Sequence, residues 1–260
     1  MKLIKFYWRL SATGFSFTAF GLGAALITFT LFPIIHLFSF RRCRAHLGCQ
    51  FMVHLSFRAF IWMMRNLGVL THEIVGAEKL TNGSGKIIVA NHPTLLDVVF
   101  LISLLPTAFC VVKKAAWSNP FFTGLLWATG YIQSDDPIKL LSNCAEQLGH
   151  GNNLLIFPEA TRTVPGRPMK LKRGAASVIA ESKKQFIPVI VTCKPSALSK
   201  ANKWYEIPHR KMHFKITVGD WIDPQRYLSM EDHLSIVKRR INTDLREILV
   251  AGIERHERSG

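Results

Sequence analysis

The alternation of apolar and polar positions divides the chain near residue 70. Before this point apolar residues run on with few interruptions, and after it short apolar runs alternate with segments of helical periodicity. Such alternation is typical of an α/β fold, so we expect a mixed, largely parallel central sheet flanked by helices. We predict strands near 71–76, 86–91, 107–113, 153–158, 186–193 and 212–219, and helices near 94–105, 117–129, 137–149, 171–183 and 229–252.

The uncharged stretch 11–40 is long enough to cross a bilayer, for which about 20 apolar residues suffice. Cations flank it on both sides and give no orientation, and several glycines and Pro33 interrupt it. It is too long for the core of a signal peptide and lacks a small-residue cleavage site, so we expect it to be retained. Three interpretations stay open: a spanning helix, a re-entrant hairpin broken near Pro33, or an interfacial helix pair.

The next segment, 51–70, places apolar side chains among His54, Arg58 and Arg65 in an amphipathic helical pattern. A basic amphipathic helix suits an anionic membrane surface, and the alternative is a basic surface helix packed on the core. We therefore expect a membrane-anchoring helical segment over 1–68 and an α/β domain over 69–260.

Charge and composition narrow the class of partner. The net charge of +16, from 33 Lys and Arg against 17 Asp and Glu, indicates an anionic partner such as nucleic acid or a phospholipid surface. A hydrophobic content of 48%, with 18 Phe and 6 Trp, favours the membrane and argues against nucleic acid. The five cysteines form no C-x-x-C pair, so neither a disulfide framework nor a zinc site is indicated, and we expect a cytoplasmic setting.

The most informative polar pair is His92 and Asp97, between the predicted strand 86–91 and the helix after it. Residues five apart on one helix stand about 140° apart around its axis, so His92 must precede the helix if the side chains are to meet. Pro93 supports this, because a residue before proline is extended while proline suits the first helical position. A carboxylate on Nδ1 then leaves Nε2 free to accept a proton. The alternative is a solvated first-turn aspartate beside a partly buried turn histidine.

A second polar group follows the predicted strand 153–158. Glu159, Thr161 and Arg162 come directly after it, where α/β sheets place ligand sites. An arginine here can hold a phosphate through two nitrogens, and further basic residues between 166 and 174 extend the positive rim. The alternative is a solvated loop with a structural Glu–Arg pair.

Together these segments resemble the glycerolipid acyltransferase family, the lysophospholipid acyltransferases that include 1-acylglycerol-3-phosphate acyltransferase. The family's N-H-x-x-x-x-D pattern is met by Asn91, His92 and Asp97, and its F-P-E-G-T-R pattern by 157–162, with Ala160 in place of glycine. The resemblance covers about residues 70 to 220, because the family's second block is similar to 112–114 and 130–132 and its fourth block to 186–189.

The resemblance implies transfer of a fatty acyl group from acyl-CoA or acyl-carrier protein to the hydroxyl of a lysophospholipid, such as 1-acylglycerol-3-phosphate, in phospholipid biosynthesis. His92 would be the general base and Asp97 would orient it. No metal or bound cofactor is needed, since the thioester supplies the activation. Oxyanion donors are expected among backbone N–H groups near the helix start or in the loop 159–162.

The resemblance also implies where the substrates bind. Arg162, with Lys113 or Lys114, would hold the acceptor's phosphate, and Glu159 would fix the loop or position Arg162. The expected partners are the phospholipid membrane, the lysolipid and the acyl donor, with no nucleic acid, at the cytoplasmic face of the membrane. The expected substrate-binding residues are Lys113, Lys114, Glu159, Thr161 and Arg162.

Two positions depart from the family's pattern. Asp136 stands where the second block commonly has an arginine, and a carboxylate facing the acceptor would repel a phosphomonoester. Ala160 implies that this position either does not require positive φ or tolerates the strain. The alternatives left open are an acyltransferase for another lysolipid such as an aminoacyl lysolipid, a thioesterase, and a non-catalytic membrane-binding protein on the same scaffold.

Overall fold

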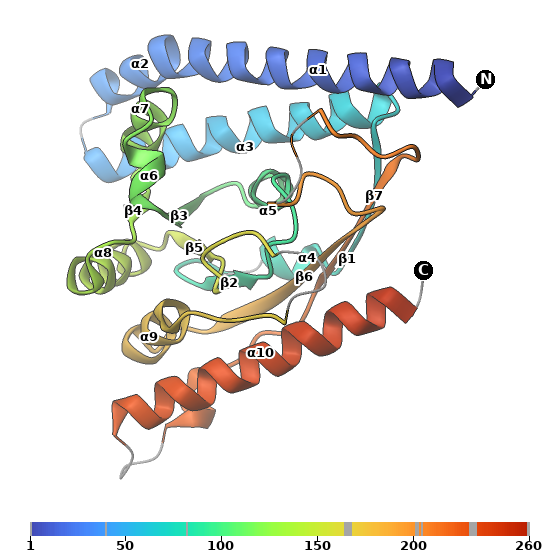
Figure 1. Cartoon of the computed structure of the whole chain (residues 1–260). Coiled ribbons are helices and arrows are strands. Elements are labelled where there is room, and N and C mark those ends of the chain that lie inside the picture. Colours follow the sequence, from blue (N-terminus) through green and yellow to red (C-terminus); the bar gives the residue numbers. More distant parts are fainter. Residues whose placement is uncertain are drawn as a thin grey trace.

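A seven-stranded sheet forms the centre of the molecule in the computed structural model (Figure 1), which describes residues 2–39, 41–81, 83–163, 168–200, 203, 205–228 and 233–258. The strand order is β1-β7-β6-β2-β5-β3-β4. Every neighbouring pair is parallel except β6 and β7, which confirms the expected mixed, largely parallel sheet. The strands are β1 (Leu70–Val75), β2 (Ile87–Ala90), β3 (Ala108–Val112), β4 (Ile132–Gln133), β5 (Asn153–Ile156), β6 (Phe186–Lys194) and β7 (Met212–Val218).

The six strands expected from the apolar runs are all present. β4 was not expected, because two residues are too few to show an alternating pattern. Strands β2, β5 and β6 are almost wholly buried, as befits a sheet covered on both faces.

Helices cover both faces of the sheet (Figure 1). One face carries α3 (Arg42–Asn66) and α5 (Asp97–Leu104), which pack on each other, and α1 (Lys2–Leu26) lies along the outside of α3. The other face carries α8, α9 and α10. The remaining helical elements have these bounds: α2 (Phe32–Phe38), α4 (Glu78–Thr81), α6 (Lys114–Trp117), α7 (Pro120–Ala128), α8 (Pro137–Gly149), α9 (Arg173–Ser182), a 3₁₀ turn (Pro224–Tyr227) and α10 (Leu234–Arg258).

The expected helix 117–129 corresponds to α7, which begins later, at Pro120, because a residue before proline disfavours helical backbone; Trp117 instead ends the preceding helix, α6. Helix α10 runs to Arg258, beyond the predicted end at 252, and residues 229–232 of that prediction lie outside the described residues.

The N-terminal apolar stretch is one continuous helical rod from Lys2 to Phe38 and does not turn at Pro33. A five-residue π-helix, Ile27–Leu31, lies just before the proline. Proline has no N–H to donate to the fourth preceding carbonyl, and a wider π turn accommodates that loss. The hairpin broken near Pro33 is therefore wrong. Within the described residues, the segment Leu3–Phe38 is long and apolar enough to cross a membrane, by length and composition.

This rod packs against the rest of the protein at both ends. Near its start, the Trp8 indole N–H donates to Leu67 O at 3.0 Å, and in its middle Phe20 stacks near Phe60 with ring centroids 4.5 Å apart. Near its end, His36 Nε2 lies 3.1 Å from Ala128 O. The rod therefore lies flat along the domain. Residues 1–68 contribute to the same core as the sheet through α3, and the division at residue 69 stays a prediction.

Candidate active site

The first motif lies at the carboxyl end of β2, in the middle of the sheet. Asn91 extends the β2–β6 ladder with its side chain: its amide donates to Val191 O at 2.8 Å, and Val191 N–H donates to its amide oxygen at 2.7 Å. Asn91 is buried, so these two bonds fix where the chain leaves the sheet. The next residue, His92, therefore starts from a defined position.

His92 and Asp97 meet as expected, with His92 Nδ1 3.0 Å from Asp97 Oδ2. The helix begins at Asp97 and not near residue 94, so His92 is outside it and Pro93 is not its first residue. Asp97 is fully buried, while the imidazole is about one-fifth exposed and stacks on Phe157 with ring centroids 4.4 Å apart. Within the described part of the chain Nε2 has no hydrogen-bond partner. The ring is thus held at one nitrogen and open at the other.

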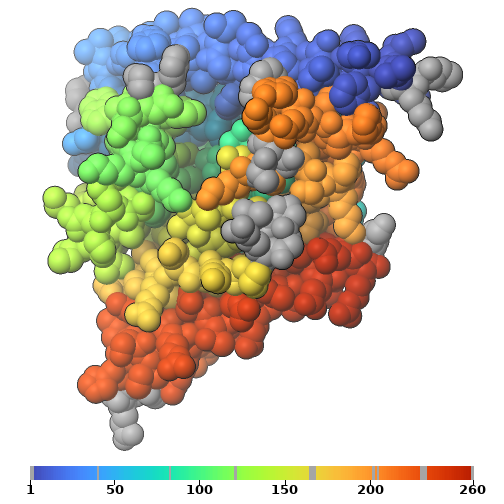
Figure 2. All heavy atoms as spheres, in the orientation of Figure 1, coloured from blue at the N-terminus to red at the C-terminus, as the bar shows by residue number. Residues whose placement is uncertain are grey.

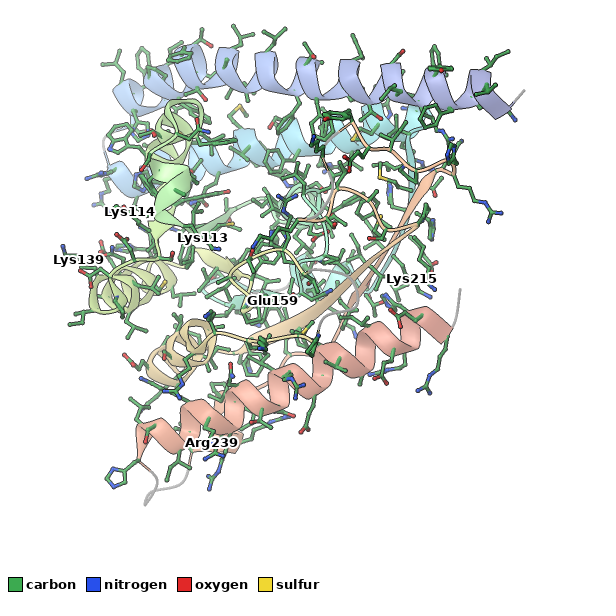
Figure 3. All side chains as sticks on the ribbon, viewed as in Figure 1. Lys113, Lys114, Lys139, Glu159, Lys215 and Arg239 are labelled. Atoms are coloured by element: carbon green, nitrogen blue, oxygen red, sulfur yellow. The ribbon has the colours of Figure 1, made fainter. Side chains whose placement is uncertain are left out.

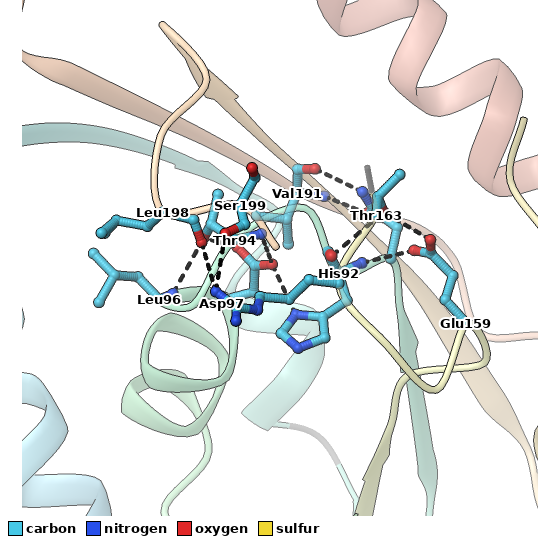
Figure 4. A network of polar contacts seen from close by, with 11 residues as sticks. His92, Thr94, Leu96, Asp97, Glu159, Thr163, Val191, Leu198 and Ser199 are labelled. Carbon is cyan, nitrogen blue, oxygen red and sulfur yellow. Dashed lines mark hydrogen bonds and ion pairs between the residues drawn. The ribbon is translucent and has the colours of Figure 1, made fainter. Parts of the chain in front are cut away.

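Thr94 holds the carboxylate of Asp97 from two sides (Figure 4). Its N–H donates to Asp97 Oδ2 at 2.6 Å, and its hydroxyl donates to Asp97 Oδ1 at 2.5 Å while accepting the Leu96 N–H at 3.2 Å. Burial raises the pKa of Asp97, and the hydrogen bonds from His92 and Thr94 oppose that rise. The Thr-x-x-Asp spacing is a capping-box pattern, the sequence signal from which Thr94 was predictable.

Glu159 joins the second motif to the first. Its Oε1 accepts the His92 N–H at 2.9 Å, and its Oε2 accepts the Thr163 hydroxyl at 2.6 Å. Thr163 N–H in turn donates to His92 O at 2.7 Å. The backbone of His92 is therefore held at both its donor and its acceptor, across 67 and 71 residues of sequence. Glu159 is buried, and these bonds favour loop fixation over direct contact with substrate; Thr163 was not among the expected site residues.

One nitrogen of the Arg162 guanidinium is used in hydrogen bonds within the protein. Its Nη1 donates to Leu198 O and Ser199 O at 3.0 and 3.1 Å, which ties the second motif to the loop after β6. Leu198 O also accepts the Leu95 N–H, so the same loop reaches the first motif. Thr161 is exposed, and no side-chain hydrogen bond is described for it. The substrate-binding roles of Thr161 and Arg162 stay predictions.

Lys113 and Lys114 follow β3, at the same edge of the sheet. Because β5 lies between β2 and β3, the end of β3 is about 10 Å from the end of β2. Lys114 Nζ is 4.0 Å from Asp135, while exposed Lys113 has no hydrogen-bond or ion-pair partner among the described residues. Lys113 is thus the freer cation at this edge. Figure 3 labels Lys113 and Lys114 at the start of α6.

Asp136 caps a helix, so its carboxylate does not have to face the acceptor site and repel a phosphate there. Its Oδ1 accepts the N–H groups of Ile138 and Lys139 at 3.1 Å each, at the start of α8. These backbone bonds, with Lys139 Nζ at 3.7 Å, lower the pKa of Asp136. Its charge is directed at a helix N-terminus, where carboxylates are favourable. Asp136 at this position is therefore compatible with a phosphomonoester acceptor.

Cys193, on β6, is not a nucleophile. Burial, with the charge of Asp97, raises the pKa of Cys193 to about 12. At neutral pH this side chain is a thiol, and thiols are poor nucleophiles. Within the described residues, no group of three or more His, Cys, Asp and Glu side chains is arranged to hold a metal ion.

Ala160 adopts a positive φ, so this position tolerates the strain that glycine would avoid. Its φ is +55°, a left-handed conformation that costs an L-residue about 1–2 kcal/mol. Replacing Ala160 by glycine should raise the free energy of unfolding by roughly 0.5–1 kcal/mol, because the relief of strain exceeds glycine's entropic cost. Chemical denaturation of both proteins measures this change in the free energy of unfolding. Ala251→Gly, at an exposed helical position, should instead lower stability by about 1 kcal/mol; a loss in both variants would contradict the assignment.

The role of Thr94 can be tested through the pH dependence of kcat/KM. Thr94→Val removes a hydrogen bond to a buried carboxylate, so the pKa of Asp97 should rise further and the acid limb of kcat/KM should move to higher pH. At a pH on that limb, we expect a loss of about tenfold or more. Thr94→Ser keeps the hydroxyl and should restore the wild-type profile. A uniform loss at every pH, with no movement of the limb, would mean that Thr94 is merely structural.

Sequence comparison relates the chain to acyltransferases. A family model described as "Acyltransferase" matches residues 71–192. A 1-acyl-sn-glycerol-3-phosphate acyltransferase of Helicobacter pylori is 29% identical over 157 residues, which are 57% of this chain and 66% of that protein. Its mouse counterpart named alpha is 26% identical over 145 residues, 53% of this chain and 51% of that protein. The matches thus span less than two-thirds of these curated relatives.

Structural comparison extends the likeness to the whole fold. The crystal structure of a 1-acyl-sn-glycerophosphate acyltransferase, PlsC, from Thermotoga maritima superimposes with a TM-score of 0.63. The alignment covers 95% of this chain and 98% of that one at 15% sequence identity. At this identity the likeness establishes the fold alone.

Proposed function

We propose that the protein transfers a fatty acyl group from an acyl thioester to the hydroxyl of a 1-acylglycerol-3-phosphate-like lysophospholipid, because residues 71–192 match the acyltransferase family model and the chain is similar to curated 1-acyl-sn-glycerol-3-phosphate acyltransferases. One observation carries the proposal. His92 is bound to a buried carboxylate through Nδ1 and presents, at the carboxyl edge of the sheet, an Nε2 that has no partner among the residues the structure describes. A hydroxyl supplied by the acceptor meets the need for a nucleophile.

The proposed reaction follows from this geometry. Nε2 of His92 removes the proton of the acceptor hydroxyl as its oxygen attacks the thioester carbonyl carbon. Asp97 stabilises the imidazolium that forms. The tetrahedral intermediate then collapses, the carbon–sulfur bond breaks, and the imidazolium returns the proton to the leaving thiolate. The products are an ester and a free thiol, and His92 is again neutral.

The hydrogen bonds already made in the two loops limit which backbone N–H groups are free to stabilise the oxyanion. The N–H groups of Thr94, Leu95 and Leu96 are all occupied by protein acceptors. Those of Thr161 and Arg162 have no acceptor within the part of the chain that the structure describes. We therefore place the oxyanion at Thr161 and Arg162, where two adjacent donors stabilise developing charge.

The acceptor's phosphate is proposed to bind Lys113 and the unengaged part of the Arg162 guanidinium, one cation from the end of β3 and one from the loop after β5. A phosphomonoester is the chemistry that two such cations select, since each forms charge-assisted hydrogen bonds to its oxygens.

Lys113→Ala should raise KM for a lysolipid with a phosphomonoester headgroup by about five- to tenfold and leave kcat nearly unchanged, because the lost contact is made equally before and during the reaction. Steady-state kinetics checks this. Lys139→Ala removes another exposed lysine, which pairs with Asp136, and should have little effect. Equal KM changes in the two variants would leave Lys113 with only a bulk electrostatic role.

We further propose that the protein lies on the cytoplasmic side of a phospholipid membrane, with α1 and α2 in the interface and not across the bilayer. The rod packs on the domain at both ends, while its outer side exposes a row of large apolar side chains. A spanning helix would have to leave these contacts. Both thioester donors are cytosolic compounds, which supports the cytoplasmic side. The outward apolar residues include Leu3, Tyr7, Phe15, Leu22, Phe29 and Leu37.

One experiment tests the proposed activity. The membrane-bound protein is incubated with acyl-CoA or acyl-carrier protein and with lysophosphatidic acid, a zwitterionic lysolipid or an aminoacyl lysolipid, and the product is identified by its mass. Preference for lysophosphatidic acid supports the proposal. Preference for the aminoacyl lysolipid would overturn the acceptor assignment, and thiol release without any lysolipid would make the protein a thioesterase.

A further inference from the structure

Helix α7, which follows Lys113 and α6 along the chain, presents two large aromatic side chains to the outside. Phe122 and Trp127 are 50% and 52% exposed, while Leu126 and Ala128 on the same helix are buried. The helix carries no charged residue. Phe122 and Trp127 are five residues apart, about 140° around the helix axis, so they border a wide exposed face that also contains Thr123. A wide, uncharged face bordered by two exposed aromatic side chains calls for an apolar environment.

This face is continuous with the outer side of the N-terminal rod. Gly124 lies so close to the rod that an added Cβ would stand 2.8 Å from Thr28 Cγ2. The Trp127 and His36 rings are 4.9 Å apart, and His36 bonds to Ala128 O. Figure 1 shows α7 directly beside α2. The rod's exposed apolar residues nearest in sequence to these contacts are Phe29, Leu31, Ile34, Leu37 and Phe38.

We propose that α7 is a third membrane-contacting helix, whose Phe122 and Trp127 enter the surface of an anionic phospholipid bilayer together with α1 and α2. The inference rests on the proposed function and deepens it, because it defines how the site meets its lipid substrate. A second copy of this chain is the other possible occupant of the face, and the test below separates the two.

The surrounding charges favour the bilayer over a second copy. The Arg42 guanidinium lies 5.7 Å from the Trp127 ring centroid, and exposed Arg41 and Arg44 flank it. Tryptophan and arginine together are typical of the headgroup level of a membrane, and each cation near an anionic surface adds attraction. A copy of this chain, with its net charge of +16, would bring like charges together.

The inference explains how a lipid acceptor reaches His92. Lys113 and α6 connect β3 to α7, so a membrane-bound α7 holds the proposed phosphate contact at headgroup depth. Figure 2 shows this face of the molecule recessed between the green residues of α6 and α7 and the orange residues after β6, beneath the blue helices. A lysolipid in the membrane can enter there with its acyl chain still in the bilayer.

The test compares the full-length protein with the double variant F122S/W127S. The matched control is Ile138→Ser, which removes an 81% exposed apolar side chain on α8. We expect binding to vesicles containing anionic phospholipid to fall by about tenfold or more in the double variant and to stay unchanged in the control. Acylation of a long-chain lysolipid in vesicles should fall with binding, whereas acylation of a short-chain, water-soluble lysolipid should not.

Fluorescence quenching gives a second readout that needs no destabilising variant. Brominated lipids should quench the protein's tryptophan emission less in Trp127→Phe than in the wild type. Unchanged vesicle binding of the double variant, or unchanged quenching in Trp127→Phe, would overturn the inference. If the wild type is a dimer and the double variant is a monomer, the inference would also be overturned, and the face would be assigned to a second copy. Vesicle binding does not depend on acyl transfer, so a failure of the proposed function alone would leave the binding results intact.

Discussion

Replacing His92 with alanine is expected to reduce acyl transfer by about 10²- to 10⁴-fold, the usual contribution of a positioned general base. Among the described residues near the pair, Asp97 is buried behind the ring, Glu159 accepts hydrogen bonds from His92 N–H and Thr163, and Cys193 is a thiol with a raised pKa, so none of these three is placed to take the proton. The measurement is the rate of lysolipid-dependent thiol release in purified membranes or vesicles.

Binding and folding should survive this change. His92 is not among the apolar side chains that contact the membrane in our proposal, so vesicle binding should stay at the wild-type level. His150→Ala, at an exposed position after α8, is the matched control and should keep full activity. An acylation rate in His92→Ala close to wild type would remove the proposed mechanism and favour a non-catalytic membrane-binding protein.

Asp97→Asn is the second large effect, and it separates charge from geometry. The amide oxygen of asparagine can accept from His92 Nδ1–H and Thr94 N–H, and its nitrogen can donate to the Thr94 hydroxyl oxygen. The arrangement is thus preserved while the negative charge is lost. We expect kcat to fall by about 10²- to 10³-fold, because the imidazolium that forms during reaction is no longer stabilised.

Stability should move in the opposite direction from activity in this variant. A buried carboxylate whose pKa is raised is costly to ionise in the folded state, so the native protein binds more protons than the unfolded chain between the ordinary and the raised pKa. The contribution of Asp97 to the free energy of unfolding therefore decreases as pH rises through that window. Asp97→Asn should abolish this decrease. Thermal denaturation against pH, with Asp136→Asn as the exposed control, checks this. A large loss of stability at neutral pH would mean that the asparagine does not adopt the proposed geometry.

Local pattern was sufficient for six of the seven strands and for the central pair, but not for β4 or for the start of α5. The buried strands are short apolar runs, and α8 begins at the predicted Pro137 because Asp136 and proline are both favourable helix-start residues. The meeting of His92 and Asp97 was predictable because only five residues separate them and Pro93 limits the backbone. Errors arose where a local signal had two meanings, as with Pro33, which bends a helix or ends one, and Asp136, which caps a helix or faces a ligand.

The sequence by itself determined the alternation of strands and helices, the apolar N-terminus and the two polar motifs, since each of these depends on residues close together along the chain. Only the tertiary structure decided that Glu159 and Thr163 hold the backbone of His92, that Arg162 reaches Leu198, and that the N-terminal rod lies flat beside α7. These contacts join segments 36 to 92 residues apart. Periodicity carries no information over such separations, because the partners meet only when parallel strands align their carboxyl ends and the core closes around them.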